Sequence, residues 1–254
     1  MKRRRVIAGN WKMYKTQAET RAFFSSLFPI VSATPQCDIV IAPPYTAITA
    51  AVEASRGSNI AIAAQDCFWE KEGAFTGEIS SSMLVEAGCR YVIIGHSERR
   101  QFFGETDETV AKKTKAALAG GLIPIVCVGE LLSHREKGQT EAVCAAQFTG
   151  GPGPLTPDEF SRILIAYEPV WAIGTGKVAT PEIAAAAHRF LRQCAESKFS
   201  AEAASALRIL YGGSVKPDNI KGLMAQSELD GALVGGASLD PKSFAALVHG
   251  CQED

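Results

Sequence analysis

The chain has 254 residues, of which 46% are hydrophobic and 21% charged, and its formal net charge is -1. This near-neutral balance excludes a global positive field that would attract nucleic acid or an anionic membrane. No apolar run approaches the roughly 18 residues of a membrane span. The seven cysteines are scattered, without the paired spacing of a metal site. We therefore expect a cytoplasmic protein with reduced thiols and no metal ion.

Short apolar runs rich in β-branched residues recur along the whole chain, after a basic N-terminus, Met1–Arg5, that we interpret as a solubilising flank. The runs are continuous and not alternating, which is typical of strands buried on both faces of a parallel sheet. The predicted strands are Val6–Ala8, Ile39–Ala42, Ile60–Ala64, Tyr91–Ile94, Ile123–Val128, Ile163–Ala166, Leu207–Tyr211 and Ala232–Val234.

Alanine-rich stretches with helical spacing lie between these runs. Start signals precede several of them, at Thr106, Thr180 and Asp240, and glycines follow at Gly88, Gly120-Gly121 and Gly250. The clearest helical stretches are Ala18–Leu27, Thr109–Leu118 and Ile183–Ala195.

Eight strand–helix units without a break in composition predict an α/β fold, a closed (β/α)8 barrel of eight parallel strands in one domain over residues 1–254. A doubly wound open sheet is the alternative. It would usually carry G-x-G-x-x-G after the first strand, and Gly9–Lys12 does not match. We interpret Gly150–Pro154 as a surface loop before a short helix at Thr156–Ser161.

In a barrel of parallel strands, the residues that follow each strand gather at one mouth, where the active site lies. Paired glycines follow the last two strands, in Gly212-Gly213-Ser214 and Gly235-Gly236. Each pair alone is typical of a turn. Together they favour a phosphate site, because glycine lets backbone N–H groups approach an anion and Ser214 adds a hydroxyl donor. Gly174 is placed to add an N–H group from the loop after the sixth strand.

Glu168 stands where the sixth strand ends, before an apolar loop, Pro169–Ala179, that we interpret as a lid. A buried carboxylate is costly unless it has a partner or a chemical task. A structural carboxylate that caps a helix or pairs with a base is the alternative. We expect apolar neighbours to desolvate Glu168 and raise its pKa, which would make it a better base near neutral pH. The expected neighbours are Val170, Trp171, Ile173 and Leu233.

His96 follows the fourth strand and precedes one helical turn, Ser97–Arg100. A helix N-terminus disfavours the imidazolium, so we expect a neutral ring that donates a hydrogen bond to a substrate oxygen. Lys12 follows the first strand, beside Asn10, and supplies positive charge for a phosphorylated substrate and a developing oxyanion. Glu98 is its expected partner. For any single histidine or lysine, a structural or solvated role is the alternative.

A carboxylate base, a neutral hydrogen-bond donor, a cation and a phosphate site suit proton abstraction next to a carbonyl, with stabilisation of an enediolate. A non-catalytic sugar-phosphate-binding barrel would need only the glycine loops. An aldolase-type barrel enzyme would need a Schiff-base lysine within a strand, and no predicted strand contains one.

The sequence resembles the triosephosphate isomerase family over nearly its full length, most specifically at Ala166–Lys177. The other matching stretches are Ala8–Lys12, Gly73–Glu78, Tyr91–Arg100, Tyr211–Val215 and Val234–Ser238. The resemblance implies an aldose–ketose isomerase, an intramolecular oxidoreductase of glycolysis and gluconeogenesis. It implies that the enzyme interconverts dihydroxyacetone phosphate and D-glyceraldehyde 3-phosphate without a cofactor.

The resemblance also implies a role for each residue at the mouth. Glu168 moves the proton between two carbons, His96 polarises the carbonyl, and Lys12 stabilises charge. Asn10 orients the site and contributes with Lys12 to substrate binding. The phosphate is held by Gly174, Ser214, Gly235 and Gly236. The groups expected to support this machinery are Ser97, Glu98, Ile173 and Leu233.

The family is usually a homodimer whose third strand–helix loop, here Gln65–Glu78, inserts into the partner near Asn10 and Lys12. Apolar residues in this loop support the idea, since a monomer would expose them. Phe75 lies at the expected dimer interface, and Thr76 is the expected contact with the partner's active site. Three departures from the family are expected to affect only the dimer and the surface: Asp66, where asparagine is common, Tyr14 and Gly150–Leu155.

Overall fold

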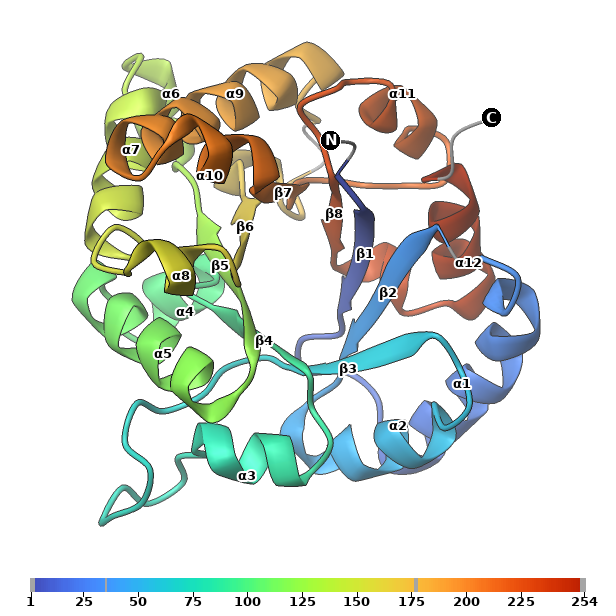
Figure 1. Ribbon diagram of the computed structural model, residues 1–254. Helices are drawn as coiled ribbons and strands as arrows, with labels where there is room; N and C mark the ends of the chain where they lie inside the picture. Colours follow the sequence, from blue (N-terminus) through green and yellow to red (C-terminus); the bar gives the residue numbers. More distant parts are fainter. Residues whose placement is uncertain (1–2, 35, 176–177, 252–254) are drawn as a thin grey trace.

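The computed structural model describes residues 3–34, 36–175 and 178–251. Eight parallel strands form a closed barrel in sequence order, and β8 pairs back with β1 (Figure 1). The predicted fold class is therefore confirmed. The strands are β1 (Arg5–Asn10), β2 (Cys37–Ala42), β3 (Ile60–Ala64), β4 (Tyr91–Ile94), β5 (Ile123–Val128), β6 (Leu164–Tyr167), β7 (Arg208–Tyr211) and β8 (Gly231–Val234).

Successive residues of a strand face two different apolar layers, and this explains the continuous apolar runs. In β1, Val6 and Ala8 belong to a cluster made only of strand residues, which fills the barrel. Ile7 between them belongs to the larger cluster shared with the surrounding helices. A strand buried on both faces needs apolar side chains at consecutive positions. The predicted strand ends consequently lie within two residues of the observed ones.

The helices surround the barrel (Figure 1). The predicted caps are present: Thr106, Thr180 and Asp240 each accept a backbone N–H in the first turn of the helix that follows. Among the described residues, no helix combines the length and the apolar character needed to cross a membrane. The helices are α1 (Gln17–Val31), α2 (Ile48–Ala54), α3 (Ser81–Glu86), α4 (Ser97–Phe102), α5 (Asp107–Gly120), α6 (Leu132–Glu136), α7 (Thr140–Gly150), α8 (Pro157–Phe160), α9 (Pro181–Lys198), α10 (Ala201–Ala206), α11 (Ile220–Met224) and α12 (Pro241–Gly250).

Two interpretations of glycine were wrong. Gly250 is the last residue of α12 and not a stop signal after it, and a Cβ there would lie 2.4 Å from Ile220 Cγ2. The expected surface loop Gly150–Pro154 is largely buried, and a Cβ on Gly153 would lie 2.4 Å from the carbonyl oxygen of Thr149. In both places glycine is needed for close packing, which depends on neighbours that the local sequence does not reveal.

The basic N-terminus is more than a solubilising flank, although its first two residues lie outside the described ranges. Arg3 donates to the Asp230 carboxylate over 2.6 Å and Arg4 to the Asp38 carboxylate over 2.5 Å. Arg5, the first residue of β1, donates to the carbonyl oxygen of Cys251 over 2.5 Å. These contacts tie the start of β1 to neighbouring strands and to the end of α12.

Candidate active site

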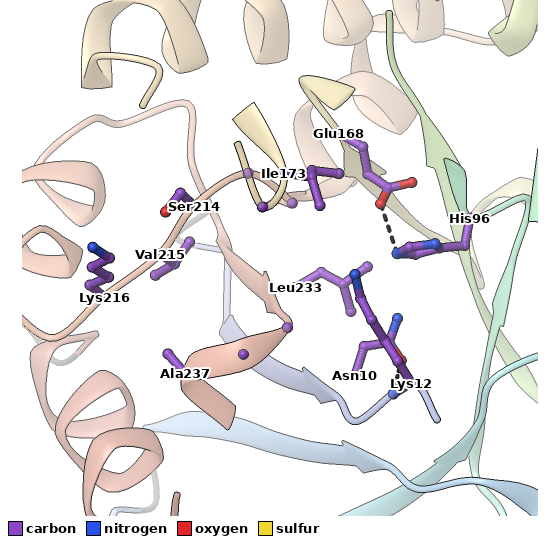
Figure 2. Close-up of a pocket in the computed structure, with 15 residues that line it drawn as sticks. Asn10, Lys12, His96, Glu168, Ile173, Ser214, Val215, Lys216, Leu233 and Ala237 are labelled. Atoms are coloured by element: carbon purple, nitrogen blue, oxygen red, sulfur yellow. Dashed lines mark hydrogen bonds and ion pairs between the residues drawn. The ribbon is translucent and has the colours of Figure 1, made fainter. Parts of the chain in front are cut away.

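A cavity of about 430 Å³ opens at the carboxyl ends of the strands (Figure 2). Ile173 and Leu233 line it, whereas Ser97 and Glu98 lie outside its lining and contact Glu168 and Lys12, respectively. The structure brings the predicted catalytic and substrate-binding residues together around this cavity: Asn10, Lys12, His96, Glu168, Gly174, Ser214, Gly235 and Gly236.

Glu168 directly follows β6, and its side chain is only 2% exposed. Its carboxylate accepts hydrogen bonds from the Ser97 backbone N–H over 2.9 Å and from the Ser97 hydroxyl over 3.3 Å. The same carboxylate lies 2.9 Å from His96 Nε2, as the dashed line in Figure 2 shows. Residues from two separate strand ends therefore meet at one carboxyl group.

The predicted rise in the pKa of Glu168 was wrong. Burial does raise this pKa, but His96, the Ser97 N–H and Lys12 favour the charged form more strongly and hold the pKa below its ordinary value. One expected apolar neighbour is also turned elsewhere. Trp171 donates its indole N–H to Glu130 over 2.9 Å, and its ring lies against the Arg135 guanidinium. Polar partners decide the charge of Glu168 in this arrangement.

His96 caps the N-terminus of α4, and its Nδ1 accepts the backbone N–H of Glu98 over 3.2 Å. A ring nitrogen that accepts a hydrogen bond carries no proton, so the hydrogen of the neutral ring is on Nε2, which faces Glu168. This tautomer is the predicted hydrogen-bond donor. The pKa of His96 nevertheless shifts in the direction opposite to that expected. Burial lowers this pKa, but the Glu168 carboxylate outweighs burial and raises it overall.

Lys12 occupies a strained backbone conformation, with φ of 52°. Its N–H donates to the Asn10 side-chain oxygen over 3.0 Å, and its carbonyl oxygen accepts from Gln65 Nε2 over 2.8 Å. Gln65 also donates to the carbonyl oxygen of Ala42, at the end of β2, over 2.9 Å. The ammonium lies 2.5 Å from a Glu98 carboxylate oxygen, the expected pair. Sequence reasoning missed Gln65 as an anchor, because only the folded backbone shows which carbonyls it reaches.

The two pairs need glycine for different physical reasons. A Cβ on Gly212 would lie 2.9 Å from Glu168 Cγ, and one on Gly213 would lie 2.2 Å from the Tyr211 hydroxyl. These two glycines therefore make room for protein neighbours. A Cβ on Gly236 would meet no atom within 4 Å, so this residue borders open space.

Three further lining residues were missed by the sequence reasoning: Val215, Lys216 and Ala237. Figure 2 shows Lys216 beyond Ser214 and Val215, on the side of the cavity away from His96. Its side chain is exposed, and no carboxylate of the described residues forms an ion pair with it. A lysine at the start of a turn has no local signal that separates it from an ordinary surface lysine.

The segment between β3 and α3 extends away from the barrel and carries the two residues predicted for a dimer interface, Phe75 and Thr76 (Figure 1). Phe75 is 44% exposed and packs on Phe68, which stacks on Trp69. Asp66 was expected to affect only the dimer and the surface, but it is buried.

The Asp66 carboxylate lies within a cluster of charges inside the protein. It accepts from the Lys113 ammonium over 2.7 Å and lies 3.0 Å from the Arg99 guanidinium.

Of the predicted lid (Pro169–Ala179), Gly176 and Lys177 lie outside the described residues. In the described part of this segment, Pro169 precedes a 3-10 turn at Val170–Ala172.

The chain is similar to known proteins over nearly its whole length. A family model described as triosephosphate isomerase matches residues 5–251. A triosephosphate isomerase of Solibacter usitatus is 63% identical over 247 residues, which cover 97% of this chain and 99% of the relative. Triosephosphate isomerases of Geotalea uraniireducens and Citrifermentans bemidjiense are each 56% identical, over 97% of this chain and 98% of each relative.

Proposed function

The chain belongs to the triosephosphate isomerase family, and we propose that Glu168, His96 and Lys12 perform its interconversion of dihydroxyacetone phosphate and D-glyceraldehyde 3-phosphate. The chain is thus an isomerase, an intramolecular oxidoreductase. One observation carries the assignment of residues. A buried carboxylate, an imidazole and an ammonium from the ends of three strands line one cavity, and the first two are 2.9 Å apart.

The reaction follows from this placement. With the phosphate at the glycine loops, the reacting carbons lie beside Glu168, which removes a proton from the carbon next to the carbonyl. The electron pair of that C–H bond forms the enediolate, and its oxyanion accepts a hydrogen bond from His96 Nε2 and is stabilised by the Lys12 ammonium. Glu168 then returns the proton to the neighbouring carbon, while the hydroxyl proton shifts between the two oxygens beside His96.

The lowered pKa of Glu168 suits a substrate-free state in which the carboxylate is ionised and held by hydrogen bonds. Its contacts with Ser97 and His96 keep the carboxylate charged at neutral pH. Substrate must take over the His96 hydrogen bond, and Glu168 must turn from Ser97 toward the reacting carbon. Loss of those contacts in an apolar, closed site would make the carboxylate a stronger base when the proton is transferred.

Neither alternative uses the whole site. A barrel that only bound sugar phosphates would need the glycine loops, yet it would still bear the cost of burying the Glu168 carboxylate and holding Lys12 in a strained conformation. An aldolase-type enzyme would need a lysine within a strand, and none of the eight strands in the described ranges contains one.

The proposed roles are tested with both triose phosphates as substrates in solvent deuterium oxide. The protein should convert each into the other and place deuterium from solvent on carbon, because the proton resides on Glu168 during the reaction. The matched variant Glu168→Gln keeps the shape and still accepts from Ser97, but it cannot take a proton. Turnover in this variant close to that of the unmodified chain would contradict the role of Glu168.

We also propose a homodimer, with the cytoplasm as its location. Beside Lys12 there is a second cavity of about 470 Å³, bordered by Met13, Tyr14 and Phe103. Met13 is 93% exposed, and a second copy inserting the segment around Phe75 would cover such apolar surface. Light scattering should give twice the mass of the 27.0 kDa chain. Thr76→Arg should shift this mass toward that of a single chain.

The proposed location in the cytoplasm is supported by the cysteines. All of them are free thiols, which is typical of a reducing compartment.

A further inference from the structure

Two thiols face each other at the end of the barrel opposite the active site. Cys37 Sγ lies 4.0 Å from Cys251 Sγ, and both residues are buried, at 2% and 0% exposed. Cys37 is the first residue of β2, and Cys251 caps the C-terminus of α12. The pair therefore joins the second strand to the last helix. Five residue steps of about 3.3 Å along β2 separate it from the mouth.

The barrel framework holds these sulfurs near each other. Arg5 is the partner of Cys37 in the β1–β2 register. Its guanidinium donates to the carbonyl oxygen of Cys251 over 2.5 Å and to that of Met224 over 2.9 Å. One arginine thus fixes the last turn of α12 against the strand that pairs with Cys37. The sulfur separation is set by this packing and not by a chance approach of two surface side chains.

The two thiols are chemically unequal. The Cys37 S–H donates to Cys251 Sγ, and this bond, aided by Arg5, lowers the pKa of Cys251 below its ordinary value despite burial. The same bond and burial raise the pKa of Cys37. A thiol whose pKa is lowered beside one whose pKa is raised has the asymmetry of an attacking and a resolving cysteine.

We propose that Cys37 and Cys251 form a reversible disulfide when the protein meets hydrogen peroxide, and that this bond fastens α12 to the barrel. The Cys251 thiolate attacks one peroxide oxygen, the O–O bond breaks, and a sulfenic acid and hydroxide form. The Cys37 sulfur then attacks the sulfenic sulfur, the S–O bond breaks, and the S–S bond forms. The Cys37 proton and a solvent proton convert both oxygens to water, so two thiols are oxidised as one peroxide is reduced.

The two sulfurs must approach by about 2 Å to form the bond. A disulfide needs the sulfurs at about 2 Å, and rotation of one side chain about its Cα–Cβ bond can supply much of the remaining approach from 4.0 Å. The bond would close nearly the whole chain into one loop, which restricts the unfolded state most. Because the active site lies at the other end of the strands, we expect stability to change and catalysis to stay constant.

The test uses the full chain treated with a small excess of hydrogen peroxide. Peptide mapping without reductant should show a Cys37–Cys251 cross-link, and Tm should rise by about 5 to 10 °C. Dithiothreitol should reverse both effects, and kcat/KM should stay within twofold throughout. Cys37→Ser and Cys251→Ser should each abolish the cross-link and the rise in Tm. Cys194→Ser, which removes a partly exposed thiol, should retain both.

The mapping of the unmodified chain decides the proposal even if a serine variant folds poorly. A cross-linked peptide that dithiothreitol cleaves would support it. The proposal is overturned if Cys251 accumulates as sulfinic acid while Cys37 stays a free thiol, or if both thiols remain reduced when other cysteines are oxidised. A cross-link that lowers Tm would overturn the stabilising role.

Discussion

The two ends of the active-site cavity are built on different principles. At the reacting end, charged and polar side chains hold one another: Glu168 contacts His96 and Ser97, and Lys12 contacts Glu98. At the other end, where we propose that the phosphate binds and which we call the phosphate end, most of the lining residues are glycines, and Lys216 has no ion-pair partner among the described residues. The reacting end depends on a few fixed side chains, whereas the phosphate end depends on backbone groups of glycines, which no side chain covers.

This difference determines how each end should respond to change. A buried charge whose partner is removed is left unsatisfied, so a single substitution at the reacting end has a large effect. A phosphate recognised by many N–H groups loses only part of its binding when one donor is disturbed. Substitutions should therefore reduce kcat at the reacting end and raise KM at the phosphate end.

Glu168→Asp should give the largest effect. Shortening the side chain by one methylene withdraws the base by about 1 Å, and kcat should fall by about a thousandfold with KM little changed. Steady-state kinetics in both directions measure this. The unfolding midpoint serves as control, since the shorter acid can still accept from Ser97. A variant that kept kcat and raised only KM would place Glu168 in binding and break the contrast between the two ends.

His96→Gln should lower kcat by about a hundredfold, because the oxyanion loses its imidazole donor. It should also change the pH profile. The pKa of Glu168 is lowered, so this carboxylate stays charged above neutral pH, and the loss of kcat/KM that its protonation causes is centred below the ordinary value of 4.5.

The variant removes the largest influence that lowers this pKa, so the loss of activity should begin at higher pH than in the unmodified chain. The substrate phosphate titrates near pH 6 in both proteins and cancels in the comparison. Superimposable profiles would show that His96 does not set the charge of Glu168.

Two glycine substitutions test the phosphate end. Gly236→Ala adds a methyl group where no atom lies within 4 Å, so Tm should stay unchanged while KM rises by about tenfold, as the methyl group obstructs the bound anion. Gly213→Ala places its Cβ against the Tyr211 hydroxyl and should lower Tm by several degrees. Thermal melts and inhibition by inorganic phosphate distinguish the two. Equal loss of Tm in both variants would contradict the open space at Gly236.

The fold could be predicted well because its signal is local. A run such as Ile123–Val128 is apolar at consecutive positions, and burial on both faces needs nothing from distant residues. The reasons for glycine at Gly153 and Gly250 could not be predicted, since they depend on which neighbours approach. A single domain over residues 1–254 stays a prediction.

The candidate site was also predictable only in part. Residues at strand ends could be placed at one mouth because the barrel topology brings them there. The pKa of Glu168 could not be predicted, because most of its expected apolar neighbours are close in sequence, whereas His96 and Ser97 reach it from another strand end. The catalytic and binding roles of these residues stay predictions until the variants are measured.

Substitution of Lys216 should have the smallest effect on kcat/KM, and it tests how the phosphate end attracts its anion. The charge of Lys12 is offset by Glu98, so the Lys216 ammonium, which has no ion-pair partner in the described part of the chain, supplies attraction for a dianionic substrate. Lys216→Met should lower kcat/KM by about threefold at low salt, and the loss should vanish as added salt screens an exposed charge. Lys198→Met removes the same charge at the C-terminal end of α9 and should change nothing. A loss in Lys216→Met that persists at high salt would instead mean a direct contact with the phosphate, and the phosphate end would then depend on a side chain as the reacting end does.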